Sequence, residues 1–268
     1  MSASVWIKCF AGSSADTYSC GREGILITHI TDDSIVAAIR EYLAVLDDHD
    51  VDGCRHYFAS LYENQPGSWA AAARNIRFGL DHFPSHGRVL DLGCGLGMQA
   101  YVFAKHDREV LGIDLNYDWI NAARAAADEL GAKNLEFLAG DVTEEIRNLT
   151  AGAIWMHRAI GHIQYLPEFF RRAHTTLRPD GALVFMTSNA TSRAIVPGMR
   201  RGQYSIKRLS RLLEDARFDV QDLTYQGYLT ALPPRYRPSN IDTIEPRLSQ
   251  IPLLRAMGGS FSMAAYAR

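Results

Sequence analysis

The chain has 268 residues, of which 47% are hydrophobic and 22% are charged, and its formal net charge at pH 7 is −2. This length fits one α/β domain with additions, or two small domains. A balanced charge provides no global positive field, so the composition argues against nucleic acid or an anionic membrane as a partner. No apolar stretch approaches the ~18 residues of a membrane span.

The N-terminal residues lack a basic segment followed by an apolar one, so we expect no secretory signal and a cytoplasmic protein. The cysteines have neither metal-ligand spacing nor the density of a disulfide framework. We therefore expect all four to be reduced: Cys9, Cys20, Cys54 and Cys94.

Residues 1–85 are expected to form a β-hairpin followed by a helical cap. Two β-prone runs, residues 5–10 and 25–30, flank a turn-rich segment, which predicts paired strands. Thr31 then provides N-cap chemistry for an amphipathic helix, and two further helices are predicted over residues 52–64 and 69–82. Two interpretations of this segment remain open. In the first, it closes the active site or joins subunits into a homo-oligomer. In the second, its helices simply cover a sheet edge.

A short apolar run at residues 89–92 is followed by glycines at alternate positions, Gly93, Gly95 and Gly97. This pattern is typical of a buried strand that turns sharply into a helix, with backbone N–H groups exposed to a ligand. A dinucleotide fingerprint would require glycine at the sixth position from Gly93, where Met98 stands. The loop predicts a small-molecule site, and an ordinary strand-to-helix turn is the alternative.

Carboxylates follow the next two predicted strands. Residues 108–114 form a strand that ends at Asp114, 17 residues beyond Gly97, where an acidic side chain can accept hydrogen bonds from ribose hydroxyls. The alternative, a helix N-cap, fits Asn116 or Asp118 better. A strand at residues 135–139 is followed directly by Gly140, Asp141 and Val142.

Four ordered motifs resemble the class I S-adenosylmethionine-dependent methyltransferases of the small-molecule type. They are VLDLGCGLG at residues 89–97, GDV at 140–142, LRPDG at 177–181, and a Tyr-Ser helix start at 204–205 that leads into FDV at 218–220. The sequence departs from the family pattern at Ala151 and Gly152, where an acidic residue is usual, and at Asp180, where glycine is usual. The resemblance covers about residues 87–268.

The resemblance implies a Rossmann-like α/β fold. We expect a seven-stranded, mostly parallel sheet with an antiparallel last strand at residues 260–267, helices on both faces, and a lid or edge excursion at residues 226–259. It also implies that residues 86–268 bind S-adenosylmethionine, with S-adenosylhomocysteine as product. The implied cofactor contacts are Asp91, Gly93, Cys94, Gly95, Gly97, Asp114, Leu115, Asp141, Val142 and His157.

Methyl transfer requires chiefly that the acceptor be held close to the methyl group and aligned with it, and a base helps only when a proton must leave. His157 and His162 follow the fourth predicted strand, where the reacting methyl is expected, so both are candidate catalytic residues. Tyr57, Tyr62 and Tyr165 are candidate substrate contacts. For each of these residues, ordinary packing is the alternative.

The sequence argues against two further classes of methyltransferase. There is no carboxylate between Glu145 and Glu168, although Mg²⁺-assisted enzymes need oxygen ligands near the fourth strand. The amino-methyltransferase motif for bases and glutamine is also missing. We therefore expect metal-independent methylation of a small metabolite on oxygen, nitrogen or carbon. Basic residues of the segment after the fifth strand either bind an acidic substrate group or are merely solvated: Arg193, Arg200, Arg201 and Lys207.

Two rival functions remain. The first is a protein of the same fold in which the cofactor is structural or regulatory, or assists a reaction other than methylation, because fold does not fix function. The second is a nicotinamide oxidoreductase, which Met98 and the Gly140-Asp141 pair disfavour.

Overall fold

The computed structural model describes residues 17–20, 25–28, 30–51, 53–63, 67–190, 204–229, 236, 238, 240–251, 254 and 257–268. At its centre is a seven-stranded sheet in the order β5-β4-β3-β6-β7-β9-β8. The strands are β3 (Val89–Leu92), β4 (Val110–Asp114), β5 (Leu135–Ala139), β6 (Ala151–His157), β7 (Leu177–Ser188), β8 (Phe218–Gln226) and β9 (Ser260–Ala267).

The sheet has the direction pattern expected from the sequence. β3, β4, β5, β6 and β7 pair in parallel, and β9 runs antiparallel between β7 and β8. The Rossmann-like prediction and the antiparallel last strand are therefore confirmed. The carboxyl ends of the parallel strands all lie at one edge of the sheet, which is where ligands bind in open α/β folds.

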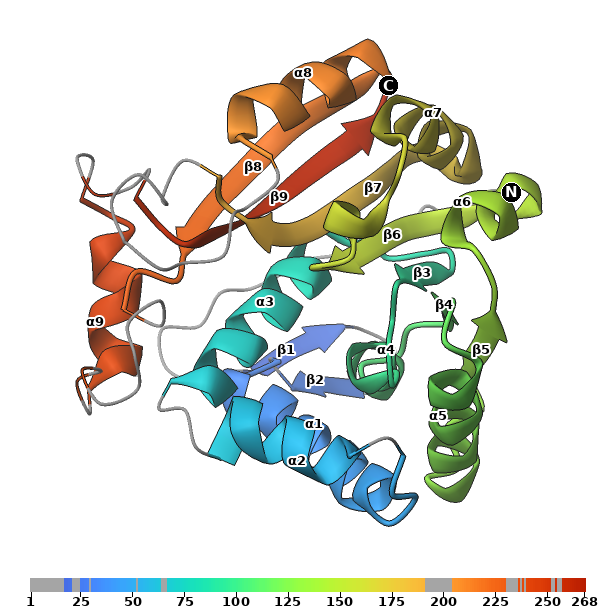
Figure 1. Cartoon of the computed structure of the whole chain (residues 1–268), viewed down its shortest axis with the longest axis vertical. Helices are drawn as coiled ribbons and strands as arrows, with labels where there is room; N and C mark the ends of the chain where they lie inside the picture. The colour runs from blue at the N-terminus through green and yellow to red at the C-terminus, as the bar shows by residue number, and fades with distance from the viewer. Residues whose placement is uncertain are drawn as a thin grey trace.

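Helices cover both faces of the sheet. They are α1 (Asp32–Asp47), α2 (Cys54–Phe58), α3 (Ser68–His82), α4 (Met98–Lys105), α5 (Tyr117–Glu129), α6 (Val142–Glu145), α7 (Leu166–Thr176), α8 (Ile206–Asp215) and α9 (Ile241–Leu248). In Figure 1, α7 and α8 lie along the upper side of the sheet, and α1, α3 and α4 lie below it.

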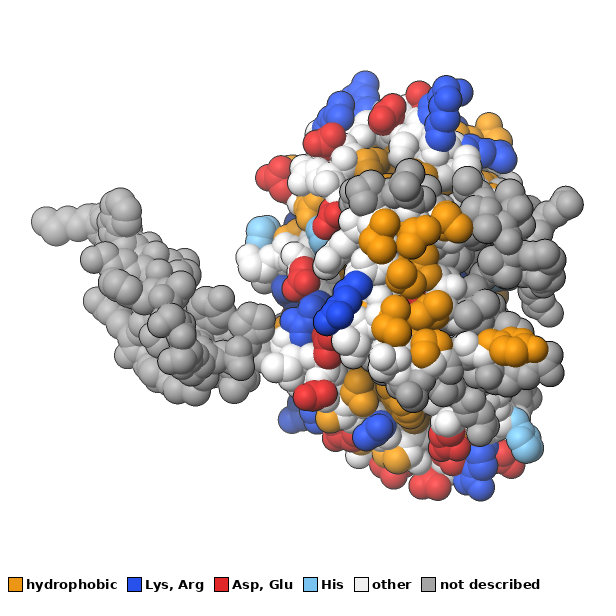
Figure 2. Space-filling model, turned by 90° about the vertical axis from the view of Figure 1, so that its left-hand side faces the viewer, with side chains coloured by type: hydrophobic (Ala, Val, Ile, Leu, Met, Phe, Trp, Pro, Cys, Tyr) orange, Lys and Arg blue, Asp and Glu red, His pale blue; other side chains and the backbone are white. Residues whose placement is uncertain are grey.

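Two hydrophobic clusters form because side chains alternate between the faces of a strand. Val89 and Trp155 pack in one cluster with residues of α1, α3, α4 and α5. Leu90 and Ile154 pack in the other with residues of α7 and α8. Among the described residues, no helix is both long and apolar enough to cross a membrane. On the side of the molecule shown in Figure 2, hydrophobic side chains gather near the middle, with charged side chains of both signs above and below them.

The N-terminal segment contains two paired strands, but the first strand is formed by other residues than expected. β1 (Thr17–Cys20) pairs antiparallel with β2 (Ile25–Thr28). The prediction was wrong in placing residues 17–20 in the turn-rich segment, because Thr and Tyr favour strands and these residues pair with β2. The other expected strand, residues 5–10, lies outside the described residues.

The cap helices begin largely where expected. Thr31 caps α1 and its side chain accepts a hydrogen bond from the Ser34 N–H, at 3.2 Å. The predicted helix over residues 52–64 is instead two pieces, α2 and the π-helix η1 (Ala59–Glu63). Single π-helical turns are common at functional sites, and η1 contributes Tyr62 to the cavity described below.

Several short elements complete the fold. The 3₁₀ turns η2 (Ile146–Asn148) and η3 (Ile160–His162) flank β6. Asp180 has a φ of +62°, which explains why glycine is usual there and why aspartate is tolerated. β6 begins at residue 151 and β8 extends to residue 226, so both strands are longer than expected. Cys54 and Cys94 are free thiols; Cys9 and the side chain of Cys20 lie outside the described part of the chain.

Candidate active site

A cavity of about 1670 Å³ lies at the carboxyl ends of the parallel strands. Pockets for one drug-sized ligand are roughly 300–1,000 Å³, so this volume has room for a cofactor and a second small molecule. The structure brings together on its wall nearly all the residues predicted from the sequence: Tyr57, Tyr62, Asp91, Gly93, Cys94, Gly95, Asp114, Leu115, Asp141, Val142, His157, His162 and Tyr165.

The glycine loop joins β3 to α4 at the centre of this wall. Gly93 has a φ of +72°, and a Cβ there would lie 2.5 Å from the Ala159 methyl group. Any other residue would therefore clash at this position. Gly97 is the one predicted contact that does not line the cavity. Its φ is +80° and a Cβ would overlap the Phe137 ring, so this glycine is required by packing beneath the loop.

Asp114 ties the loop to the end of β4. Its Oδ2 accepts from the Gly95 N–H at 2.8 Å, and its Oδ1 accepts from the Asn116 N–H at 2.9 Å. A carboxylate has about four acceptor positions, so both oxygens keep capacity for a ligand. The N-cap of α5 is Asn116, whose side chain accepts from the Trp119 N–H. The capping alternative for Asp114 is therefore excluded.

Asp91 is a carboxyl group on the cavity wall with 1% of its surface exposed. Its Oδ2 atom has no hydrogen-bond partner. Burial, with a smaller effect from the negative charge of Asp114, raises the pKa of Asp91 to about 8. A buried carboxyl oxygen without a hydrogen-bond partner is costly unless something binds it, and its chemistry suits a cationic ligand.

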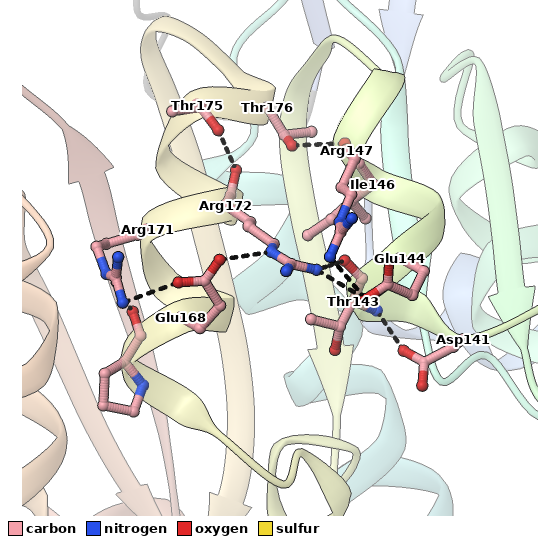
Figure 3. Close-up of polar contacts among 11 residues, drawn as sticks. Asp141, Thr143, Glu144, Ile146, Arg147, Glu168, Arg171, Arg172, Thr175 and Thr176 are labelled. Atoms are coloured by element: carbon pink, nitrogen blue, oxygen red, sulfur yellow. Dashed lines mark hydrogen bonds and ion pairs between the residues drawn. The ribbon is translucent and has the colours of Figure 1, made fainter.

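Asp141 follows β5 and caps α6, because its Oδ1 accepts from the Thr143 N–H at 2.7 Å. A network of charged side chains holds this turn against α7 (Figure 3). Arg172 donates to Glu168 Oε1 at 2.8 Å, to Glu144 Oε1 at 3.0 Å and to the Thr143 carbonyl at 2.8 Å. The network fixes the cavity wall on the β5 side.

His157 ends β6 and stacks on Trp155 of the same strand face, with ring centroids 6.4 Å apart. Burial, assisted by the positive charge of Arg158, lowers the pKa of His157 to about 3. The imidazole is therefore neutral at physiological pH and is a weak proton acceptor. His162 lies in η3 at the exposed rim of the cavity.

The three candidate tyrosines lie at different depths. Tyr57 and Tyr165 are 55% and 64% exposed at the cavity mouth. Tyr62 is deeper: its ring packs at a tilt against Trp69, with ring centroids 4.7 Å apart, and its hydroxyl lies 3.5 Å from Met98 Sδ. Burial raises the pKa of Tyr62 to about 12, so its phenol keeps its proton.

Sequence reasoning missed several polar residues on the same wall. They are Arg74 and Asn75 on α3, Gln99 on α4, Arg158 after β6, Gln226 at the end of β8, and Glu245 on α9. Glu245 is 2% exposed and accepts from the Tyr228 and Leu229 N–H groups at 2.6 and 2.9 Å. No motif marks these residues, because they come from separate elements; only the position of Arg158 beside His157 was a signal.

Of the four basic residues singled out after the fifth strand, only Lys207 belongs to the described part of the chain. Lys207 lines a small surface hollow on α8 with Ser205 and Arg208, apart from the main cavity. Arg193, Arg200 and Arg201 lie outside the described residues. In the part of the chain that the structure describes, no group of three or more His, Cys, Asp and Glu side chains is arranged to hold a metal ion.

Comparison with known proteins agrees with this geometry. A family model described as "Methyltransferase domain" matches residues 84–224. A ubiquinone biosynthesis O-methyltransferase from Actinobacillus pleuropneumoniae serotype 7 is 28% identical over 130 residues, which are 46% of this chain and 55% of that protein. The chain thus spans about half the length of this curated relative.

Solved structures share the fold. A SAM dependent methyltransferase from Archaeoglobus fulgidus matches with a TM-score of 0.56 and 16% identity, over 80% of this chain and 100% of that one. The [4+2]-cyclase SpnF matches with a TM-score of 0.54 and 19% identity, over 74% and 82%. Because the family match covers more than half of the chain and the sheet order and glycine loop agree with it, the chain belongs to the methyltransferase domain family, in its class I, S-adenosylmethionine-dependent form.

Proposed function

We propose that this protein transfers the methyl group of S-adenosylmethionine to a small-molecule acceptor without a metal ion. The observation that carries the proposal is that the glycine loop, Asp91, Asp114 and the neutral His157 line one and the same cavity. The volume of about 1670 Å³ accommodates both reactants. The O-methyltransferase name of the curated relative supports oxygen as the acceptor atom.

The residues fit the cofactor. Gly93 and Gly95 let a ligand lie against the loop, and Asp114 has acceptor capacity for ribose hydroxyls. The unpartnered Oδ2 of Asp91 suits the positive charge of the cofactor. Asp141, Val142 and Leu115 line the part of the wall proposed for the adenine.

S-adenosylmethionine, when bound, supplies an electrophilic methyl group. What this chain contributes is positioning: its walls hold and align the acceptor and exclude water. Because the pKa of His157 is low, we propose that its neutral imidazole orients the acceptor through a hydrogen bond; this deepens the candidate role assigned from the sequence. His162, Tyr57, Tyr62 and Tyr165 remain candidate contacts of the acceptor.

The test is calorimetric titration with S-adenosylmethionine and S-adenosylhomocysteine, with NAD as the control ligand. We expect micromolar binding of both sulfur compounds and none of NAD. Asp114→Ala should weaken binding by about 1–3 kcal/mol, because ligand hydroxyls lose their acceptor. Asp118→Ala is the matched control, since Asp118 is an exposed carboxylate on the adjacent helix that does not line the cavity. Unchanged affinity in a folded Asp114→Ala protein would remove the ribose role.

One alternative has specific support. The structural likeness to a protein named as a [4+2]-cyclase shows that this fold also occurs in a protein named for a different reaction. Incubation with S-adenosylmethionine and a panel of acceptors separates the two, because methyl transfer accumulates S-adenosylhomocysteine in step with methylated product. Conversion of an acceptor without S-adenosylhomocysteine would favour the alternative.

A further inference from the structure

Arg158 occupies an unusual backbone position on the cavity wall. It follows β6 directly and has a φ of +60°, a conformation that residues other than glycine and asparagine rarely adopt. Its N–H donates to the Met186 carbonyl at 2.8 Å, which holds this conformation against β7. Unfavourable backbone geometry of this kind clusters at functional sites.

The guanidinium of Arg158 has no acidic partner among the residues that the structure describes. Other arginines do have one: Arg172 contacts Glu168 and Glu144, and Arg77 contacts Asp32 at 2.8 Å. The positive charge of Arg158 lowers the pKa of His157 and acts against the rise in the pKa of Tyr62. Arg158 lines the cavity together with His157 of β6 and Tyr62 of η1, the residues proposed to face the acceptor.

A second arginine, Arg74, lines the same cavity. Arg74 belongs to α3, is half-buried, and likewise has no acidic partner within the described ranges. Its neighbour Asn75 is 5% exposed and its Oδ1 accepts from the Gln226 amide, which fixes this part of α3 to the end of β8.

The acidic residues of the cavity do not neutralise these two arginines. Asp91 and Asp114 lie at the glycine loop, and Asp141 caps α6. Glu144 and Glu168 are engaged by Arg172, and Glu245 accepts from two backbone N–H groups. The cavity wall therefore carries two guanidinium groups, those of Arg158 and Arg74, that form no ion pair with the described residues.

We propose that Arg158 and Arg74 bind an anionic group, a carboxylate or a phosphate, on the methyl acceptor. This inference rests on the proposed function and names its substrate class. A guanidinium presents planar donors that match both oxyanions. An anion held between the end of β6 and α3 fixes one end of the acceptor, so that its reacting atom is presented to the cofactor in one orientation.

The test uses small aromatic probes that differ in whether they carry a carboxylate, a phosphate or a neutral group. Protein saturated with S-adenosylhomocysteine is titrated with benzoate, phenyl phosphate and neutral benzamide. We expect at least one anion to bind tenfold or more tightly than benzamide, and the stronger of the two anions identifies the group as carboxylate or phosphate. If neither anion binds better than benzamide, the inference is wrong, while the bound S-adenosylhomocysteine leaves the proposed function standing. Absence of S-adenosylhomocysteine binding would reject both.

Variants assign the effect to the two side chains. Arg158→Ala and Arg74→Ala should each weaken binding of the preferred anion at least tenfold, and Arg158→Lys should fall between Ala and wild type because it keeps the charge without the planar donors. Arg217→Ala is the matched control: Arg217 is exposed, has a φ of +66° and precedes β8 at the opposite edge of the sheet. Undiminished S-adenosylhomocysteine affinity shows that each variant is folded. Wild-type anion affinity in both alanine variants would overturn the inference.

Discussion

At the scale of single residues, the raised pKa of Asp91 predicts that ligand binding depends on pH. Its pKa of about 8 lies above the ordinary value because burial penalises the charged form. The folded apoprotein therefore holds this proton more tightly than the unfolded chain does. The stability that this proton contributes is fully present below about pH 4 and is lost as pH rises through 8.

A cationic cofactor should reverse this preference, because it favours the ionised carboxylate. We expect the dissociation constant of S-adenosylmethionine to fall by up to about tenfold per pH unit between pH 6 and 8, with release of a proton on binding. Calorimetry in buffers of different ionisation enthalpy measures that proton. Asp91→Asn should bind more weakly and lose the pH dependence; a wild-type slope in this variant would assign the proton to another group.

Substitutions of His157 distinguish a role in positioning the acceptor from a role as general base. We expect His157→Ala to lower kcat by up to about a hundredfold through misplacement of the acceptor, with little change in cofactor affinity. His157→Gln should recover part of that loss, because an amide can also form a hydrogen bond. His86→Ala, at an exposed histidine away from the cavity, should have no effect.

The pH–rate profile is an independent test of the role of His157. With a pKa near 3, the imidazole contributes no ionisation between pH 5 and 9. A glutamine variant as inactive as the alanine one, together with a wild-type ionisation near neutrality that the variant lacks, would instead establish a general base.

At the scale of elements, the contact between α9 and the end of β8 bears on the predicted lid at residues 226–259. Glu245 holds the two elements together through the Tyr228 and Leu229 N–H groups and also lines the cavity. Loosening this contact should affect the acceptor end of the cavity while leaving the glycine loop in place.

We therefore expect Glu245→Gln to raise the KM for the acceptor by about tenfold, because hydrogen bonds to a charged acceptor contribute about 1.5–3 kcal/mol each. The dissociation constant of S-adenosylmethionine should stay within about twofold of wild type. Glu214→Gln, at an exposed carboxylate on α8, serves as control. An equal loss of cofactor affinity would show that α9 supports the whole cavity and is not a separate lid.

At the scale of the whole molecule, the cavity joins parts of the chain that are far apart in sequence. Tyr42 on α1 donates to the Leu96 carbonyl of the glycine loop at 2.6 Å, so the N-terminal helix α1 supports this loop directly. A ligand that fills this cavity should consequently stabilise the entire fold.

S-adenosylhomocysteine at a hundred times its dissociation constant should stabilise the folded state by about 2.7 kcal/mol. For a chain of this size that corresponds to a rise in Tm of about 5–10 °C, measured by differential scanning calorimetry. NAD should produce no shift, and Asp114→Ala should produce a smaller one at the same ligand concentration. A rise with NAD as large as with S-adenosylhomocysteine would contradict the cofactor assignment.

The sequence alone determined the succession of the seven strands after residue 86, the glycine loop, and the carboxylates that follow successive strands. These features are local: glycine at positive φ, an N-cap such as Asn116, and apolar runs that must be buried act over a few residues, so their pattern is readable in the chain. The same locality sets a limit: the three alternating glycines look equivalent in the sequence, although in the structure Gly97 packs near Phe137 and does not line the cavity.

Only the tertiary structure decided which polar side chains from separate elements meet on the cavity wall. Arg74, Arg158, Gln226 and Glu245 come from α3, the β6 end, the β8 end and α9, and each is an unremarkable surface-type residue in its own segment. Their convergence depends on the crossover order of the sheet and on how α3 and α9 pack at its edge. The pKa values of Asp91 and His157 likewise follow from burial, which depends on packing by residues distant in sequence.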